Sequence, residues 1–366
     1  MSNSATPQPR ASILKIAPYV GGEAKVAGIE RPIRLASNES ALGPSAKALA
    51  AYHAVGPEMF RYPDGHSTAL RQALARHHGI EAERIVCGLG SDDLIHLIAE
   101  AYAGEGDEVI YGRHGFSIYP IAAMTVGATP VAAPEKNLTF DVDAALALVT
   151  PKTKLVFIAN PNNPTGTYIP RAELERLHAG LPPSVILVID AAYAEYVVRS
   201  DYESGLALAA RAPNVVMTRT FSKIYAMGGL RLGWCYSSAA IADVLNRIRG
   251  PFNVNIAAQA AGVAALEDVA ATDRAREHNN LWRPWFAREL EALGLELTPS
   301  VANFVLARFP KPPKHADAAW EFLRARGILV RKVGVYHLPE HLRISIGTEA
   351  ELRAVVKALK EFLGQA

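Results

Sequence analysis

The chain has 366 residues, of which 50% are hydrophobic and 20% are charged, and its formal net charge is +2. This composition is typical of a globular protein with one large or two moderate cores, and it excludes a strongly basic nucleic-acid-binding protein and an acidic disordered chain. Because no apolar run approaches ~20 residues and the first residues do not form a secretory signal, we expect a cytoplasmic protein without membrane or nucleic-acid partners. Cys87 and Cys235 lie in apolar runs, and we expect both to be buried and reduced.

Residues 1–33 predict an N-terminal arm. About the first twelve residues contain no apolar core and predict disorder. Residues 13–33 include the run ILKIAPYVGG, which is too short to form a core by itself. We therefore expect this segment to lie against the rest of the protein rather than to fold independently.

Residues 34–250 predict a large α/β domain. The runs LVFIAN (155–160), VILVID (185–190) and VVMTR (215–219) are rich in β-formers and lack polar alternation, as strands of a parallel sheet do when both faces are covered. Amphipathic helices lie between them, for example at 171–178 after Pro170. This alternation favours a mostly parallel central sheet with right-handed crossovers and flanking helices.

Residues 251–366 predict a smaller α+β domain. Glycine and proline interrupt the sequence at RIRGPFNVN (247–255), which places the predicted boundary near residue 250. Beyond it, the pattern predicts a long helix around 282–293, a strand at 303–309, a helix around 318–326, and strands in ILVRKV and LRISIG.

Polar side chains follow several of the apolar runs at the point where each run ends. Asn163 follows the first run, Asp190 ends the second, Lys223 follows the third, and Ser91 follows the glycine turn of IVCGLG. Taken singly, these are a turn, a helix cap, a solvated lysine and a weak phosphate-binding turn. In open parallel sheets, however, ligands bind outside the carboxyl ends of the strands, so together they favour one binding crevice.

One group of these residues suits a phosphate. A helix that begins at Ser91 and Asp92 offers free backbone N–H groups to an anion. Thr220 and Ser222 add hydroxyl donors, and Arg231 adds a permanent positive charge.

The other group suits an aromatic aldehyde. A lysine in apolar surroundings beside cations has a lowered pKa, so Lys223 is a candidate Schiff-base former. A buried carboxylate at Asp190 would keep a ring nitrogen protonated, and Tyr193 and Asn163 would suit a ring hydroxyl. Phosphate, aldehyde, pyridine nitrogen and ring hydroxyl together describe pyridoxal phosphate.

Several segments carry a resemblance to a known family: LASNESALGPS (35–45), RYPDG (61–65), GLGSDD, PNNPTG, DAAYAEY (190–196), TRTFSK with GGLRLGW, and LRISIG (342–347). From APYVGG to LRISIGT, the chain resembles the fold-type I pyridoxal-phosphate-dependent aminotransferases, and among them the histidinol-phosphate aminotransferases. The resemblance implies a large domain with a mostly parallel sheet and a smaller α+β domain.

The resemblance also implies roles around the cofactor. Lys223 would be the Schiff-base lysine and proton shuttle, and Asp190 would pair with the pyridinium nitrogen. Tyr193 and Asn163 would bind the ring oxygen, and Phe116 of HGFSIY would stack on the ring. The phosphate would be surrounded by Ser91, Asp92, Thr220, Ser222 and Arg231. The neighbouring Tyr119 is interpreted as a packing residue.

Further roles implied by the resemblance concern the substrate and a partner subunit. Tyr62 of RYPDG resembles a tyrosine that reaches the phosphate of the other subunit, which implies a homodimer with shared sites. Arg343 and Arg331 would bind the anionic ends of the substrate, and Tyr19 on the arm would close over its ring.

The reaction implied is transamination between histidinol phosphate and 2-oxoglutarate, in histidine biosynthesis. Three alternatives stay open: an aromatic amino acid transaminase, a phosphothreonine decarboxylase, and a regulator that binds the cofactor without catalysis. The sequence contains no HExxH motif and no cysteine cluster, so we expect no metal site.

Overall fold

The computed structural model describes residues 7–309 and 312–365, so residues 1–6 of the roughly twelve-residue segment for which disorder is predicted lie outside the described part. Arg10 donates a hydrogen bond to the carbonyl of Thr125 at 2.6 Å. A short 3₁₀ turn follows at Ile13–Lys15. Among the described residues, no helix has both the length and the hydrophobicity that a membrane crossing requires.

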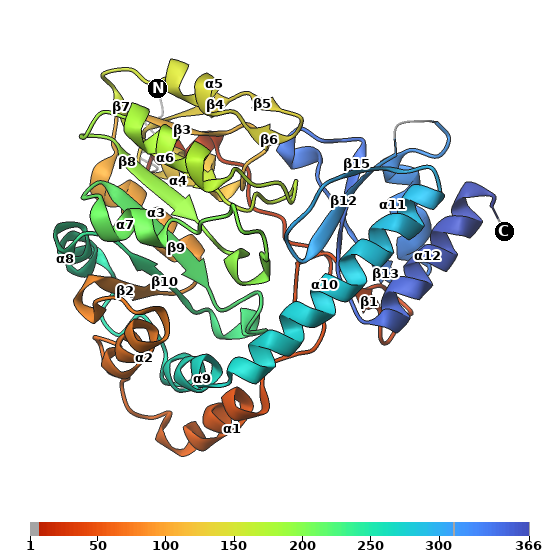
Figure 1. The fold of residues 1–366 in the computed structure, drawn as a ribbon, viewed down its shortest axis with the longest axis horizontal. Coiled ribbons are helices and arrows are strands. Elements are labelled where there is room, and N and C mark those ends of the chain that lie inside the picture. Colours follow the sequence, from red (N-terminus) through yellow and green to blue (C-terminus); the bar gives the residue numbers. More distant parts are fainter. Residues whose placement is uncertain (1–6, 310–311, 366) are drawn as a thin grey trace, which may run out of the picture.

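A seven-stranded sheet forms the centre of the large domain, in the order β2-β10-β9-β8-β7-β3-β4 (Figure 1). Only β10 runs opposite to its neighbours, and the pairs from β9 to β4 are parallel. The strands are β2 (Ile85–Gly88), β3 (Glu108–Gly112), β4 (Thr129–Ala133), β7 (Thr153–Ala159), β8 (Ile186–Asp190), β9 (Val215–Thr220) and β10 (Gly233–Tyr236). The predicted fold-type I architecture is therefore confirmed, and each of the three predicted strands is present within two residues.

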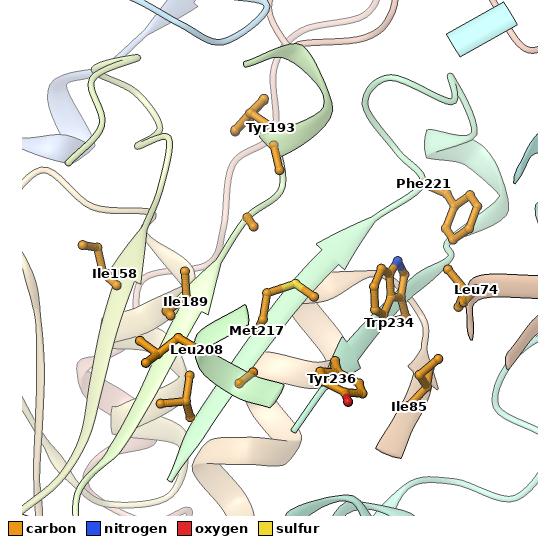
Figure 2. Packing of buried hydrophobic residues seen from close by; sticks show 14 of the residues in the cluster. Leu74, Ile85, Ile158, Ile189, Tyr193, Leu208, Met217, Phe221, Trp234 and Tyr236 are labelled. Atoms are coloured by element: carbon orange, nitrogen blue, oxygen red, sulfur yellow. The ribbon is translucent and has the colours of Figure 1, made fainter. Parts of the chain in front are cut away.

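Helices cover both faces of this sheet, which explains the absence of polar alternation in its strands. In β8, Leu187 and Ile189 pack in one core cluster, whereas Ile186 and Val188 pack in the other. Figure 2 shows Ile189, Met217 and Trp234 within the first of these clusters. The helices packed on that side are α1 (Ala46–Ala54), α2 (Thr68–His78), α5 (Val142–Ala147), α6 (Arg171–Gly180), α7 (Leu206–Arg211) and α9 (Ile256–Glu267). Those on the other side are α3 (Ser91–Tyr102), α4 (Ile118–Thr125) and α8 (Ala239–Ile248).

The small domain has its own core beneath a four-stranded antiparallel sheet, in the order β11-β12-β15-β14. Its strands are β11 (Glu296–Thr298), β12 (Phe304–Arg308), β14 (Arg331–Lys332) and β15 (His341–Ser345). Helices α11 (Ala316–Ala325) and α12 (Glu349–Leu363) lie beside it in Figure 1. A separate short pair, β5 (Glu135–Lys136) and β6 (Thr139–Phe140), belongs to the large domain.

The packing of α9 and α10 places the domain junction later in the chain than the predicted boundary near residue 250. Helix α9 lies in the large core, and the long helix α10 (Val269–Ala292) contributes Ala275 to the large core but Phe286 and Leu290 to the small one. Figure 1 shows α10 running from α9 toward the small sheet. We propose that the junction lies within α10, because the first half of this helix packs in the large core and its second half packs in the small core.

The arm ends in the small domain rather than in the large one. Strand β1 (Ile33–Arg34) pairs in parallel with β13 (Ile328–Leu329), and the Leu35 side chain is buried in the small core. The residues just after this strand, including Asn38, then pass between the two domains, since Asn38 bonds both to Tyr193 and to Ser345.

Candidate active site

A cavity of about 380 Å³ lies at the carboxyl ends of the large-domain strands and extends to the small domain and the arm. That volume is within the range of small-molecule sites. The predicted site residues, with the exception of Tyr62, all line it. They are Tyr19, Ser91, Asp92, Phe116, Asn163, Asp190, Tyr193, Thr220, Ser222, Lys223, Arg231, Arg331 and Arg343.

One end of the cavity is built to receive an anion. Ser222 Oγ accepts hydrogen bonds from Thr220 Oγ1 at 3.0 Å and from Arg231 Nη1 at 3.3 Å. Helix α3 begins at Ser91 and points its free N–H groups toward the same end. Glycine suits position 90, because its φ of 95° is strained for other residues and because a β-carbon would lie 2.6 Å from Arg231 Nη2 and displace that guanidinium.

Lys223 lies just beyond strand β9. Its Nζ donates to the carbonyl of Ser37 at 3.1 Å and lies 5.8 Å from the centre of the Tyr193 ring. Burial, with a smaller contribution from the positive charge of Arg343, lowers the pKa of this amine to about 8. A sizeable fraction of Lys223 is therefore neutral near physiological pH, and the neutral amine is the nucleophilic form.

Asp190 ends strand β8 and is buried at 4% exposure. Its Oδ2 accepts from the hydroxyl of Tyr119 at 2.9 Å, and its Oδ1 accepts from Thr218 Oγ1 at 3.3 Å. Burial raises the pKa of Asp190 to about 6, with the hydrogen bond from Tyr119 opposing that rise. A cationic ring nitrogen would relieve this buried charge, as a buried carboxylate requires.

Tyr193 lines the cavity, and its hydroxyl is held by Asn38, a residue of the segment that passes between the two domains. Asn38 Nδ2 donates to the Tyr193 hydroxyl at 2.9 Å. Asn38 has a left-handed backbone with φ of 55° and is fixed by bonds to Ser345 and from Asn303. Sequence reasoning assigned no role to Asn38, although asparagine is a residue type that tolerates this backbone region.

A second cationic part of the cavity lining comes from the small domain. Arg343 is buried, and it donates to Asn163 Oδ1 and to the carbonyl of Ala36. Its Nε is buried without a hydrogen-bond partner among the described residues. Arg331 donates to the carbonyl of Val20 on the arm at 2.7 Å. A buried guanidinium with an unused donor favours an anionic ligand in this part of the cavity.

Three aromatic side chains close this part of the cavity. Tyr19 lies 5.9 Å from the Arg331 guanidinium, as measured to its ring centre, so the arm and β14 meet here. Tyr336, which the sequence did not single out, also lines the cavity. Phe116 lies on the large-domain side and contacts Tyr119 edge to face with ring centres 5.9 Å apart.

Tyr62 is placed elsewhere. Its side chain is 82% exposed, and its ring stacks on Phe252 with centres 4.7 Å apart. It does not line the cavity of its own subunit. This exposure leaves the side chain accessible to a second subunit, and the contact with a partner subunit stays a prediction.

The donor set fits pyridoxal phosphate. The cavity offers an anion site beside a glycine of positive φ, an amine of lowered pKa, and a buried carboxylate that needs a cationic partner. These groups belong to adjacent strand ends, β8 and β9, and to the start of α3. Among the described residues, no group of histidine, cysteine and acidic side chains is arranged to hold a metal ion.

Comparison with known proteins agrees with this chemistry. The sequence model of the aminotransferase class I and II family matches residues 30–359. The chain belongs to this family. The predicted aminotransferase activity and pyridoxal phosphate cofactor are thereby confirmed at the level of the family.

The relatives of this aminotransferase are similar along its whole length. It is 58% identical to the histidinol-phosphate aminotransferase of Rhodospirillum centenum, over 98% of this chain and 99% of the relative. It is 55% identical to that of Paramagnetospirillum magneticum, with the same coverage. Among solved structures, the histidinol-phosphate aminotransferase of Sinorhizobium meliloti in complex with pyridoxal-5'-phosphate has a TM-score of 0.92 and 30% identity, covering 99% of both chains.

Proposed function

We propose that this aminotransferase transfers an amino group between histidinol phosphate and 2-oxoglutarate, in histidine biosynthesis. The observation that carries the proposal is one cavity lined by Lys223, by Arg231 beside the phosphate-type hydroxyls of the large domain, and by Arg331 and Arg343 of the small domain. The large-domain part suits the cofactor phosphate, and the small-domain part suits an anionic substrate. The names of the most similar relatives support the same substrate.

At the cofactor, each residue would act through the contacts described above. Arg231, Ser222, Thr220 and the start of α3 at Ser91 and Asp92 would hold the phosphate. The Arg231 guanidinium is already oriented without the phosphate, because it donates to the carbonyls of Gly228 at 3.0 Å and Leu89 at 3.3 Å. Preorganised donors of this kind hold an anion without reorganisation when the ligand enters.

The ring would be held by residues from three elements. Asp190 would pair with the ring nitrogen, while Tyr193 and Asn163 would bind the ring hydroxyl. Phe116 would stack on the ring face. Pyridoxal phosphate supplies an electron sink for the bond that breaks at the substrate α-carbon.

Lys223 would have two tasks. Its amine would hold the cofactor until a substrate amine displaces it. Once free, the neutral amine would take the α-proton from the substrate and deliver it to C4′ of the cofactor, a task that suits a positioned base with a pKa near the working pH. Its pKa of about 8 meets that condition.

Arg343, Arg331 and Tyr19 would bind the substrate. Phosphate and carboxylate both accept two parallel hydrogen bonds from a guanidinium, so one arginine-lined end can take histidinol phosphate and 2-oxoglutarate in turn. Tyr19 would cover the substrate ring from the arm.

We expect Arg331→Ala to weaken the reaction of histidinol phosphate selectively. Losing one cation from a desolvated charged pair costs about 2 kcal/mol, so kcat/KM for this donor should fall roughly 30-fold. Phenylalanine has no charged tail, and its kcat/KM should change much less. Steady-state kinetics with both donors would measure this difference.

The neighbouring Lys332→Ala is the matched control. Lys332 pairs with Asp317 at 2.9 Å and does not line the cavity, so both reactions should stay at parent level. Equal losses for both donors in Arg331→Ala would assign that arginine a structural role.

A half-reaction assay separates the proposed substrate from the alternatives. Histidinol phosphate, phenylalanine and phosphothreonine would each be mixed with the holoenzyme, and absorbance would report conversion of the pyridoxal to the pyridoxamine form. Rapid conversion by histidinol phosphate alone is the expected result. Preference for phenylalanine would favour the aromatic transaminase, release of carbon dioxide from phosphothreonine would favour the decarboxylase, and no conversion would favour the regulator.

We further propose a cytoplasmic homodimer whose active sites are shared, without nucleic-acid or membrane partners. The net charge of +2 supports the absence of a nucleic-acid partner. The exposed rings of Tyr62 and Phe252 support a contact with a second subunit, because two stacked aromatic rings in water are an apolar surface that a partner would cover.

Tyr62→Phe should weaken cofactor binding by about tenfold, since a hydrogen bond to a charged phosphate contributes about 1.5 kcal/mol or more. Titration of the apoenzyme with pyridoxal phosphate would give the dissociation constants. Tyr52→Phe, which removes another exposed tyrosine hydroxyl, should leave them unchanged. An active monomer in sedimentation would rule out the shared site.

A further inference from the structure

Tyr119 was interpreted from the sequence as a packing residue, but its hydroxyl contacts Asp190, which lines the candidate active site. It lies on α4, its side chain is 0% exposed, and its ring stacks on Phe157 of β7 with centres 5.0 Å apart. Its hydroxyl donates to Asp190 Oδ2 at 2.9 Å. Tyr119 itself does not line the cavity, whereas Asp190 does.

Packing alone does not account for this hydroxyl. A phenylalanine would fill the same space beside Phe157, whereas a buried hydroxyl is costly unless it has a partner. The partner here is a buried carboxylate, and a hydrogen bond to an ionised acceptor is about twice as strong as a neutral one. The tyrosine therefore stabilises the ionised form of Asp190 specifically.

The two side-chain donors to Asp190 do not use all of its acceptor positions. Tyr119 occupies Oδ2 and Thr218 occupies Oδ1, and each carboxylate oxygen has a second acceptor position. Because Asp190 also lines the cavity, the carboxylate is held with acceptor capacity toward the ligand. Other groups that act on its charge are Asp92 on α3, which opposes ionisation, and the N–H of Ala192, which favours it.

We propose that Tyr119 is a positioning residue that keeps Asp190 ionised, so that the proton shared between Asp190 and the ring nitrogen of the cofactor stays on the nitrogen. This inference rests on the proposed cofactor contact of Asp190. A carboxylate that already accepts a strong hydrogen bond is a weaker base. Without Tyr119, Asp190 becomes more basic, the proton moves to the carboxyl, and the ring becomes a neutral pyridine, which withdraws electrons less well.

The test uses Tyr119→Phe, which keeps the ring and removes only the hydroxyl. In the apoenzyme labelled with ¹³C at aspartate carboxyls, the Asp190 resonance is assigned by its loss in Asp190→Asn. We expect its titration in Tyr119→Phe to move up by about one pH unit. This measurement needs neither cofactor nor substrate.

Two readouts on the holoenzyme complete the test. With ¹⁵N-labelled cofactor, the ring-nitrogen resonance in Tyr119→Phe should move toward that of neutral pyridine. For the amino donor, kcat should fall about tenfold or more while KM stays within twofold. Tyr111→Phe is the control, since Tyr111 lies on the adjacent strand β3, packs against the same core cluster and does not line the cavity.

The outcomes separate this inference from the proposed function. An unchanged Asp190 titration and an unchanged ¹⁵N resonance would show that Tyr119 only packs, whatever the substrate is. A parent enzyme that does not convert histidinol phosphate would overturn the substrate assignment, while the apoenzyme titration would still decide the role of Tyr119. Thermal unfolding of Tyr119→Phe near that of the parent shows that both readouts report on a folded protein.

Discussion

Replacing Lys223 by alanine should lower the rate of transamination by about 10⁴-fold, because the variant loses both the covalent anchor and the proton-transferring base. Burial lowers the pKa of this amine to about 8, and no other lysine lines the cavity among the described residues. Cofactor should still bind non-covalently, because the phosphate end of the site is intact. Single-turnover kinetics measures the rate of the proton-transfer step.

Borohydride trapping checks the anchor independently of activity. Reduction of the parent holoenzyme should leave a phosphopyridoxyl group on the peptide containing Lys223, and the Lys223→Ala protein should carry none. Lys152→Ala removes an exposed lysine and should match the parent in both measurements. Turnover of Lys223→Ala near the parent rate would mean that another group moves the proton.

Replacing Asp190 by asparagine should lower kcat by roughly 10²-fold with little change in substrate KM. The amide keeps the shape of the side chain but not its charge, so the ring nitrogen loses the partner that keeps it protonated. Removal of one preorganised electrostatic partner has an effect of this size in other enzymes. Steady-state kinetics and the ¹⁵N resonance of the bound cofactor would both record the change.

Asp201→Asn provides the matched control for that substitution. Asp201 pairs with Tyr168 and Arg199 at the surface and does not line the cavity, so its loss of charge should leave kcat unchanged. If Asp190→Asn retains the parent kcat, the electron sink does not depend on this carboxylate. A loss confined to KM would instead place Asp190 at the substrate.

Much of the candidate site could be predicted from the sequence because its signals are local. Asp190 ends a continuous apolar run, and Lys223 and Arg231 follow the next run at a fixed spacing across a Gly-Gly turn. Parallel strands bring such ends to one edge of the sheet, so residues 33 positions apart meet without further information. The family resemblance then assigned each of these positions a role.

Other contacts could not be predicted, because they join segments that no local pattern connects. Arg343 bonds to Asn163 across 180 positions, and Asn38 bonds to Tyr193 across 155. Tyr119 occupies an apolar helix face, where its sequence context is that of a core residue, and only the docking of α4 on the sheet brings its hydroxyl to Asp190. In each case the tertiary packing, rather than the spacing of residues along the sequence, determines which groups meet.

The sequence by itself predicted the α/β architecture of the large domain, the candidate lysine, carboxylate and phosphate-binding groups that line the cavity, and the class of chemistry. Hydrophobic periodicity and strand-end polar residues are properties of short segments, which a sequence records directly. The tertiary structure alone decided that β10 enters the sheet antiparallel between β2 and β9, that β1 joins the small domain, and that α10 belongs to both cores. These choices depend on which apolar surfaces can be buried together, and that burial is a property of the whole chain.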